Sequence, residues 1–216
     1  LDDEYSTMKR LGITGIELLE SCSMGSSAVG RAILVPDQGQ VHVLKYIHGL
    51  AKAVEQLGGN IFTDTHVSQI QGSVPCTVTV DGGFAVNSKE IVMATNAPIH
   101  DNIQVYGKQA AYRTYVIAAK IPKGSVKKAL YWDTSQSKDS DAYHYVRLTP
   151  KNDTHDVIII GGEDHKTGQQ DSAELRFANL ERWARAKLPD MQELEWKWSG
   201  QVMESDDGIA LIGRLP

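Results

Sequence analysis

Residues 161–169 combine side chains that could do chemistry near neutral pH. They read Gly-Gly-Glu-Asp-His-Lys-Thr-Gly-Gln and follow the apolar run 157–160, which predicts a buried strand. Loops at the end of a rigid strand often carry functional side chains, and the charge of histidine changes near neutral pH. His165 is therefore a candidate for binding a substrate or moving a proton. The alternative is a solvated turn with an incidental histidine.

Two expected strands, residues 110–119 and 142–148, bring tyrosine and arginine onto a common face, because side chains alternate along a strand. The residues that share a face are Arg113 with Tyr115 on the first strand, and Tyr143, Tyr145 and Arg147 on the second. Arginine can bind a carboxylate through two parallel hydrogen bonds. Such a face could anchor a carboxylate substrate through Arg113. The alternative is that these residues simply occupy half-exposed sheet faces.

Several common cofactor motifs are missing from the sequence. Residues 25–32 keep the glycine spacing of a Walker phosphate loop, but they lack its lysine and its magnesium-binding hydroxyl, which favours a flexible connector. The dinucleotide fingerprint G-x-G-x-x-G does not occur. The seven histidines follow no metal-binding spacing, so no metal site is predicted.

Composition limits the class of protein. The 216 residues carry a net charge of −5 without a basic cluster, so we expect no nucleic-acid partner. No apolar run approaches the roughly 20 residues that cross a bilayer, so no membrane span is expected. Cys22 and Cys76 are too few for a disulfide framework, and the acidic first residues do not form a signal peptide. We expect a reduced, cytoplasmic setting.

Helical periodicity is clear in two segments. The first spans residues 41–57 and ends at a glycine pair, and the second spans residues 172–187. Residues of the second helix that can face a sheet are Leu175, Ala178, Leu180, Trp183 and Ala186. All four tryptophans are expected in the core or at an interface; they are Trp132, Trp183, Trp196 and Trp198.

Most other apolar segments predict strands, while the small-residue stretch 21–30 predicts a connector. A hairpin is expected at residues 77–86 around Asp-Gly-Gly. Further extended segments are expected at residues 15–19, 32–35, 60–63, 65–70, 90–95, 110–119, 129–132, 142–148, 157–160, 195–202 and 209–212. The pattern indicates an α+β protein, with a helix and a hairpin in its first half and a mostly antiparallel sheet in its second.

The order of four segments resembles a known superfamily. LKYIHGLAKAVEQLGGNIFTDTHV, EIVMATNAP, GGEDHKTGQ and WSGQVMESDDGIALIGR follow one another along the chain. Together they resemble the D-amino-acid-oxidase-like superfamily of FAD-dependent oxidoreductases, which includes sarcosine and glycine oxidases. They are especially similar to a bacterial branch in which a Rieske iron–sulfur domain often follows the flavoprotein. The resemblance covers nearly the whole chain.

This resemblance implies roles for individual residues. The residues that match positions near the FAD cofactor are Val67, Ala94, Thr95, Asn96 and Gly213. His165 matches a histidine that lies over the flavin beside the substrate. Tyr145 falls near a tyrosine of the same cavity, and Asp207 lies in a loop that helps to shape it. Arg113 and Tyr143 are substrate-binding candidates from strand geometry alone.

The resemblance also implies a division of the chain. Residues 1–30 would form a helix end and a connector, and residues 31–100 part of the FAD-binding α/β domain. Residues 101–200 would form the antiparallel substrate-binding sheet, and residues 201–216 a strand returning to the FAD domain. The family's N-terminal glycine fingerprint and its later glycine-rich segment are absent. We therefore expect an internal fragment that binds FAD weakly by itself, with open strand edges that favour homo-oligomers.

The implied reaction moves a hydride equivalent from a substrate C–N bond to the flavin and gives an imine that water hydrolyses. His165 would hold or deprotonate the amine, and Tyr145 would orient the substrate. Two alternatives are a non-catalytic module that binds small ligands and a flavin dehydrogenase for a hydroxy acid or polyol. The amine itself, and the choice between oxidase and dehydrogenase, are left open.

Overall fold

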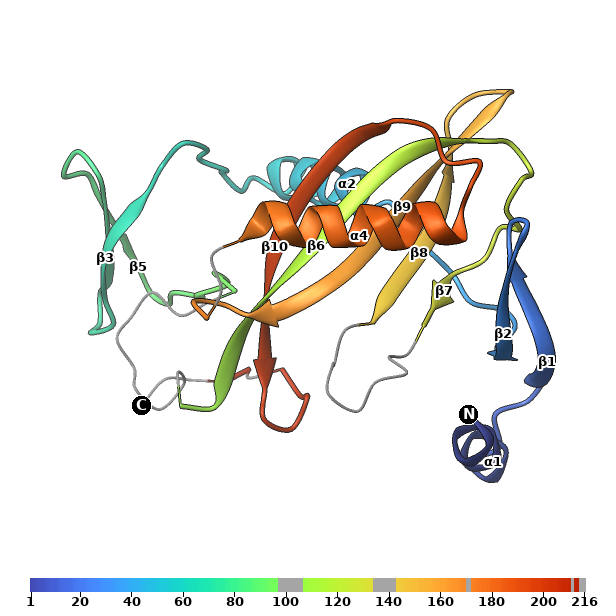
Figure 1. The fold of residues 1–216 in the computed structure, drawn as a ribbon. Helices are drawn as coiled ribbons and strands as arrows, with labels where there is room; N and C mark the ends of the chain where they lie inside the picture. Colours follow the sequence, from blue (N-terminus) through green and yellow to red (C-terminus); the bar gives the residue numbers. More distant parts are fainter. Residues whose placement is uncertain (97–106, 134–142, 170–171, 211, 214–216) are drawn as a thin grey trace. The chain divides into compact units, whose positions relative to one another are not determined.

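The computed structural model describes residues 1–96, 107–133, 143–169, 172–210, 212 and 213. The chain divides into two compact units, and each is described by itself. One unit contains Leu1–Gln38 and Lys108–Pro216, and the other contains Gly39–Gly107. Helices and antiparallel sheets occur together (Figure 1), which confirms the expected α+β class. The division of the chain into residues 1–30, 31–100, 101–200 and 201–216, which the family resemblance implies, stays a prediction.

A five-stranded antiparallel sheet forms the centre of the first unit. Its strands run in the order β10-β6-β9-β8-β7, so β6, β9 and β8 have neighbours on both sides. The strands are β6 (Gln109–Pro122), β7 (Tyr131–Trp132), β8 (His144–Pro150), β9 (His155–Lys166) and β10 (Leu194–Ser205). Their apolar and β-branched residues favour this extended conformation.

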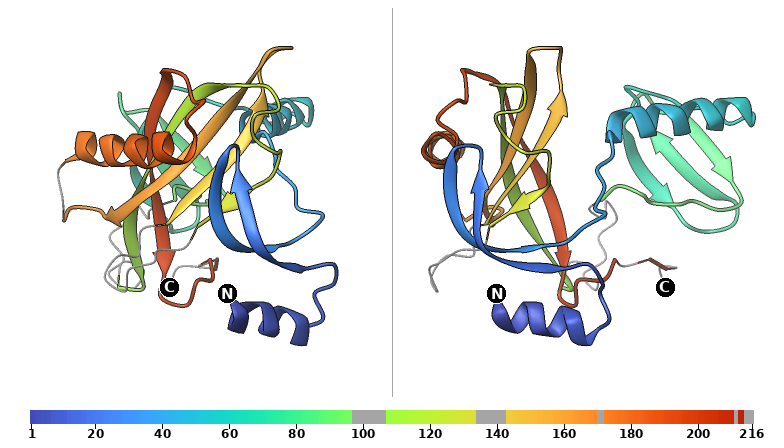
Figure 2. Two further views of the ribbon diagram at one scale, coloured as in Figure 1. Left: turned by 45° about the vertical axis from the view of Figure 1, so that its right-hand side comes forward. Right: turned by 90° about the vertical axis from the view of Figure 1, so that its right-hand side faces the viewer.

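Helix α4 (Ala173–Lys187) packs across one face of this sheet, which we call the helix face (Figure 2). Leu180 and Ala184 of the helix are fully buried. The sheet residues of the same core are Tyr115, Ile117, Ala119, Ile121, Val146, Leu148, Ile158 and Ile160. Burial of these apolar side chains is the main source of stability for this layer.

The residues of α4 that face the sheet differ from those expected. Leu175 is 55% exposed, whereas Phe177 packs against the core together with Trp183. Positions 177, 180 and 184 follow the i, i+3, i+7 spacing of one helical stripe. Leu175, Ala178 and Ala186 are exposed and lie outside that stripe, so the expectation for these three residues is wrong.

The opposite side of the sheet, which we call the outer face, has a different composition. Paired residues of neighbouring antiparallel strands point to the same side. By this register the outer face carries Thr114, Val116, Trp132, Tyr145, Gly161, Trp196 and Trp198. Only Trp183 of the four tryptophans packs against the core, whereas Trp132, Trp196 and Trp198 are 73%, 49% and 46% exposed.

Strand β9 contains one extra residue at its C-terminal end. Tyr115 of β6 pairs with Gly162, but Arg113 pairs with His165, so Thr114 lies opposite both Glu163 and Asp164. The backbone of Glu163 has a φ of 59°, which few side chains adopt without local support. This β-bulge reverses the alternation of side chains beyond it. His165 therefore points to the helix face instead of sharing a side with Gly161.

Two glycines before the bulge make room for strand β8. A Cβ atom on Gly161 would lie 2.1 Å from the ring of Tyr145, which therefore lies across the backbone of β9. A Cβ atom on Gly162 would lie 2.6 Å from the carbonyl oxygen of Tyr143, and the φ of Gly162 is 151°. The first contact is with a side chain that can move, and the second is with the backbone.

The N-terminal region is more ordered than its composition predicts. After α1 (Asp2–Arg10), strands β1 (Glu17–Met24) and β2 (Ser27–Leu34) pair as an antiparallel hairpin. The connector expected at residues 21–30 is thus wrong, because Gly25, with a φ of 63°, turns the chain and the small residues continue both strands. Met24 joins the core of the first unit.

The second unit contains α2 (Val43–Gln56) and a three-stranded antiparallel sheet. Its strands are β3 (Val67–Gln71), β4 (Cys76–Val80) and β5 (Ala85–Ser88), which confirms the expected hairpin. Residues 60–63 and 90–95 form no strand in the described part of this unit. A strand needs a paired neighbour, and these segments join no sheet there.

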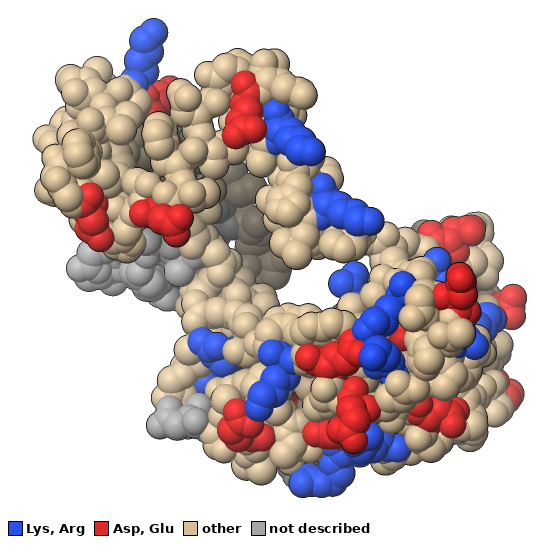
Figure 3. Space-filling view, turned by 90° about the horizontal axis from the view of Figure 1, so that it is seen from above, with Lys and Arg blue, Asp and Glu red and all other residues tan. Residues whose placement is uncertain are grey.

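Charged side chains are spread over the surface. Acidic and basic residues are interspersed on the face shown in Figure 3. On the first unit, Glu195 forms ion pairs with both Lys120 and Lys151. Among the described residues, no helix has the length and apolar character needed to cross a membrane.

We predict unequal effects of adding a methyl group at the two glycines. Gly162→Ala should lower the free energy of unfolding by roughly 2–4 kcal/mol, because both its backbone angle and a carbonyl oxygen oppose the new side chain. Gly161→Ala should lower it by about 1 kcal/mol, the order of one lost hydrogen bond, as the Tyr145 ring moves away. Urea unfolding followed by tryptophan fluorescence measures both.

Gly200→Ala in β10 is the matched control, since a Cβ atom there would meet nothing within 4 Å. Its effect should stay within about 0.5 kcal/mol. If Gly161→Ala and Gly162→Ala are as mild as Gly200→Ala, the close packing of β8 on β9 is contradicted.

Candidate functional site

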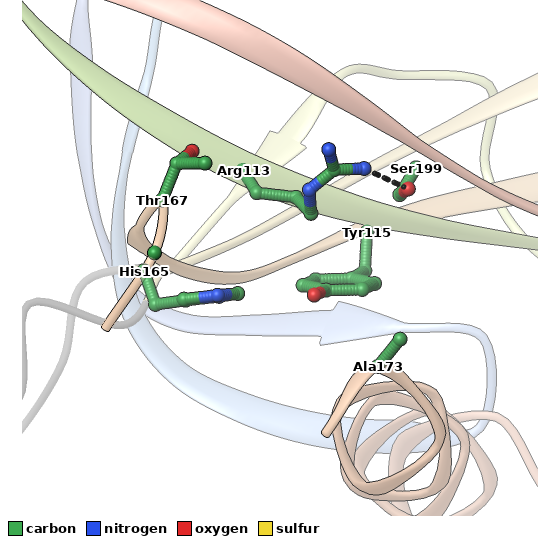
Figure 4. Close-up of a pocket in the computed structure, with 7 residues that line it drawn as sticks. Arg113, Tyr115, His165, Thr167, Ala173 and Ser199 are labelled. Atoms are coloured by element: carbon green, nitrogen blue, oxygen red, sulfur yellow. Dashed lines mark hydrogen bonds between the residues drawn. The ribbon is translucent and has the colours of Figure 1, made fainter. Parts of the chain in front are cut away.

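A cavity of about 280 Å³ lies on the helix face, beneath the start of α4. Its polar lining consists of Arg113, His165, Thr167 and Ser199, and Tyr115 and Ala173 are among its other walls. Figure 4 shows the Arg113 side chain above the rings of His165 and Tyr115, with Ala173 at the end of the helix. We call this the helix-face cavity.

Fixed contacts hold the side chains of the helix-face cavity. The rings of Tyr115 and His165 stack with centroids 5.7 Å apart and planes 13° apart. Arg113 donates a hydrogen bond of 2.9 Å to the Ser199 hydroxyl. The Nδ1 atom of His165 and the Oγ1 atom of Thr167 are buried, and neither has a hydrogen-bond partner among the described residues. Unpaired buried polar atoms are unfavourable, so this cavity is suited to a polar ligand.

A second group of polar and aromatic side chains lies on the outer face. We call Thr114, Trp132, Tyr143, Tyr145 and Asp164 the outer-face cluster. The hydroxyls of Tyr145 and Thr114 share a hydrogen bond of 2.9 Å. The ring of Tyr143 lies 5.4 Å from that of Trp132 and 6.1 Å from that of Tyr145, measured between centroids.

The tyrosines of the outer-face cluster hold their protons firmly. Burial, the charge of Asp164 and a hydrogen bond to that carboxylate raise the pKa of Tyr143 to about 12. Burial also raises the pKa of Tyr145. Both phenols are therefore neutral hydrogen-bonding groups at physiological pH. The Oδ1 atom of Asp164 is buried and has no hydrogen-bond partner in the described part of the chain.

Glu163, the residue at the bulge, contacts both helix α4 and the neighbouring strand β8. Its carboxylate accepts a hydrogen bond of 3.2 Å from Asn179 and lies 3.6 Å from Arg176, both on α4. It also lies 3.7 Å from the Nε2 atom of His144 on β8. The His144 ring stacks on Trp183 with centroids 4.1 Å apart. These contacts support the unusual backbone angle of Glu163.

The other side of the His144 ring contacts an acid. Asp133 accepts a hydrogen bond of 3.0 Å from Nδ1 of that ring and another from the backbone N–H of His144. Burial alone would raise the pKa of Asp133, but these hydrogen bonds and the His144 charge outweigh burial and lower it. The charged carboxylate therefore helps to fix the ring that contacts Glu163.

The sequence-predicted site residues fall into two groups. Arg113 and His165 pair across β6 and β9 and line the helix-face cavity. Tyr143 and Tyr145 lie on the outer face, as strand alternation predicts. The expectation that His165 and Tyr145 line one cavity is not met, because the bulge at Glu163 turns His165 to the other side of the sheet. Their catalytic roles stay predictions.

Two other predicted residues lie near the end of the chain. Asp207 follows β10 and accepts a hydrogen bond of 3.0 Å from the backbone N–H of Ile209. Gly213 is exposed, and a Cβ atom there would meet nothing within 4 Å. Neither residue lines the helix-face cavity.

The remaining predicted cofactor residues belong to the second unit. Val67 begins β3, is half-buried and pairs with Val80. Ala94, Thr95 and Asn96 follow the three-stranded sheet, and Asn96 has a φ of 64°. Their contacts with FAD stay predictions.

Sequence reasoning missed several residues of both groups. Asp164, Thr114, Thr167 and Ser199 were not singled out as site residues, although each takes part in one of them. A signal was present in the consecutive glycines that continue an apolar strand. Glycine inside a strand often marks a bulge or the close approach of another chain segment.

The sequence matches one family model and is similar to several known proteins. The model of the FAD dependent oxidoreductase family, DAO, matches residues 2–216. The chain is 26% identical over 185 residues to the putative Rieske 2Fe-2S iron-sulfur protein YhfW of Bacillus subtilis strain 168, covering 85% of this chain and 35% of that protein. It is 28% identical over 228 aligned residues to the gamma-glutamylputrescine oxidoreductase of Escherichia coli K12, covering 100% of this chain and 51% of that protein.

Among solved structures, the Diels-Alderase PyrE3 of pyrroindomycin biosynthesis superimposes with a TM-score of 0.47 and 12% identity, covering 94% of this chain and 44% of that one. The chain spans 35% and 51% of the length of the two curated relatives named above. The matched family is FAD dependent. Because the family model matches almost every residue, the chain belongs to the FAD dependent oxidoreductase (DAO) family.

Proposed function

We propose that the whole protein oxidises a C–N bond of an amine or amino acid with FAD, and that the outer face of the sheet lies on the substrate side. Membership of an FAD-dependent family supports the redox class. The name of one relative, gamma-glutamylputrescine oxidoreductase, denotes oxidation of a putrescine derivative, which is an amine. This relative supports amine oxidation over the alternatives of a hydroxy-acid or polyol substrate.

The observation that carries the proposal is the outer-face cluster. Helix α4 occupies the helix face, so within the first unit a planar ring system has the outer face available to it. That face presents exposed aromatic rings, including Trp132, Trp196 and Trp198. Aromatic surfaces pack well against flat, polarisable rings. The outer face therefore fits the ring end of a flavin or a bound amine.

The residues expected near FAD include Val67 and residues 94–96 of the second unit, and their contacts with the cofactor are part of this proposal. When bound, FAD accepts a hydride equivalent from the substrate carbon.

The outer-face cluster can favour loss of hydride from an amine. A neutral amine that gives up a hydride equivalent leaves a positively charged iminium group, which loses a proton to form the imine. The negative charge of Asp164 would stabilise that developing charge most strongly where water is excluded. The hydroxyl of Tyr145, held by Thr114, would accept a hydrogen bond from the amine N–H and so orient the nitrogen while its lone pair stays free.

We predict that Tyr145→Phe lowers kcat/KM for the amine substrate by roughly tenfold to a hundredfold, the effect of one hydrogen bond to a charged group. The ring over Gly161 is retained, so the folded structure should persist. Steady-state kinetics and the flavin absorbance of the purified whole protein measure activity and cofactor content separately. Flavin content should stay unchanged.

Tyr131→Phe is the matched control for Tyr145→Phe. Tyr131 lies on β7, packs against the core, and donates a hydrogen bond of 2.8 Å to the Lys127 carbonyl. Loss of this hydrogen bond in Tyr131→Phe should leave kcat/KM nearly unchanged. Equal losses in the two variants, or a colourless whole protein, would contradict the proposal.

Substitution of His165 distinguishes the outer face from the helix-face cavity as the place of the reaction. Because the sheet separates His165 from the outer-face cluster, we expect His165→Gln to change kcat by less than about threefold. A loss of turnover larger than that of Tyr145→Phe, at normal flavin content, would instead place the chemistry in the helix-face cavity. Single-turnover flavin reduction by the amine measures this step directly.

A further inference from the structure

We propose that the helix-face cavity binds a small oxyanion, a carboxylate or a phosphate, as a ligand separate from the amine substrate. This proposal does not rest on the function proposed above. The cavity, of about 280 Å³, is large enough for such a group. Its wall combines a cation with hydroxyl and ring nitrogen groups, which is the chemistry that recognises oxyanions.

Arg113 supplies the charge of this site. It forms no ion pair in the described part of the chain, and its guanidinium donates to the neutral Ser199 hydroxyl at 2.9 Å. The guanidinium has five N–H donors in a fixed plane, so this bond leaves others for a ligand. An arginine held in a cavity by a neutral hydroxyl is well placed to bind an anion through two parallel hydrogen bonds.

The acids on neighbouring elements are engaged with other cations. Glu163 lies 3.6 Å from Arg176, and Glu174 forms an ion pair of 2.8 Å with Lys197. Asp164 lies beyond the bulge and contacts Tyr143 on the outer face. The balance of charge around the cavity therefore remains favourable for an anion.

Two further polar groups complete the cavity. The Nδ1 atom of His165 and the Oγ1 atom of Thr167 are buried without hydrogen-bond partners among the described residues. Ala173, the first residue of α4, lines the cavity, and the preceding Ser172 makes no side-chain capping bond. The first N–H groups of a helix are unpaired within it and carry partial positive charge. A bound oxyanion would satisfy several of these donors together.

The sheet keeps this anion apart from the outer-face cluster. Arg113, Tyr115 and Ser199 point to the helix face, whereas the intervening Thr114 bonds Tyr145 on the other side. A small substrate that contacts Tyr145 cannot also reach the Arg113 guanidinium through the backbone of β6. Arg113, which was expected to bind the carboxylate of the substrate, is thus assigned to a separate ligand site.

Isothermal titration of the whole protein with sodium phosphate, and separately with sodium acetate, tests the site at constant ionic strength. We expect saturable binding of at least one anion. Arg113→Met should weaken it by roughly tenfold or more, since hydrogen bonds to charged groups are the strong ones. Binding of phosphate alone identifies a phosphate site, and binding of acetate alone identifies a carboxylate site.

Two variants serve as controls. One controls for the loss of a positive charge, and the other tests whether anion binding is independent of the outer face. Arg182→Met removes the same charge from α4 nine residues beyond Ala173, about 13 Å along the helix, and should leave the affinity within twofold. Tyr145→Phe should also leave it unchanged. An equal loss in Arg113→Met and Arg182→Met, or no saturable binding of either anion, would overturn the proposal.

Ala173→Glu gives a test that does not depend on the folding of Arg113→Met. A carboxylate in the first turn of a helix is electrostatically favourable, and here it could reach Arg113 as an internal ligand. We expect this variant to stay folded and to lose binding of the added anion. Undiminished binding in folded Ala173→Glu would refute the assignment.

Discussion

The extra residue in β9 determines which side chains this sheet presents on each of its faces. Glu163 takes a φ of 59° between Gly162 and Asp164, and the pairing with β6 shifts by one residue at that point. Because the side-chain period of a strand is two, one inserted residue exchanges the two faces for every position beyond it. Asp164 consequently joins the tyrosines of the outer face, and His165 joins Arg113 beneath α4.

The bulge persists because its neighbours support it on every side. Gly161 leaves room for the Tyr145 ring, and Gly162 leaves room for the backbone of β8. Glu163 itself is held by α4 and by His144, whose ring is fixed between Trp183 and Asp133. A backbone conformation that costs about 1–3 kcal/mol survives where the surroundings determine it in this way. Helix α4 thus has two roles, since it covers the core and fixes the turn of β9.

Sequence reasoning found the features that depend on local periodicity. The helix at residues 172–187, the hairpin around residues 77–86 and the shared face of Tyr143 and Tyr145 all follow from regular spacing. The features it missed depend on pairing. The stretch 21–30 looks like a connector because its residues are small, yet Gly25 lets it fold into a hairpin. Residues 60–63 look like a strand from their composition, but strands form only where a neighbour supplies hydrogen bonds.

The candidate site also combines features that follow from local periodicity with features that depend on strand pairing. His165 of the motif GGEDHKTGQ lines a cavity, and the face of the sheet that it occupies is set by a single insertion that periodicity does not show. The two halves of the motif serve different sides of the sheet. Gly161 and Asp164 shape the outer face, and His165, Thr167 and Gly168 line the helix-face cavity.

The most direct test of this account is a crystal structure of the whole protein with FAD and an unreactive amine bound. The account predicts that the amine nitrogen lies on the outer face, within hydrogen-bond distance of the Tyr145 hydroxyl, with His165 on the opposite side of the sheet. An amine bound between His165 and Arg113, beneath α4, would contradict it.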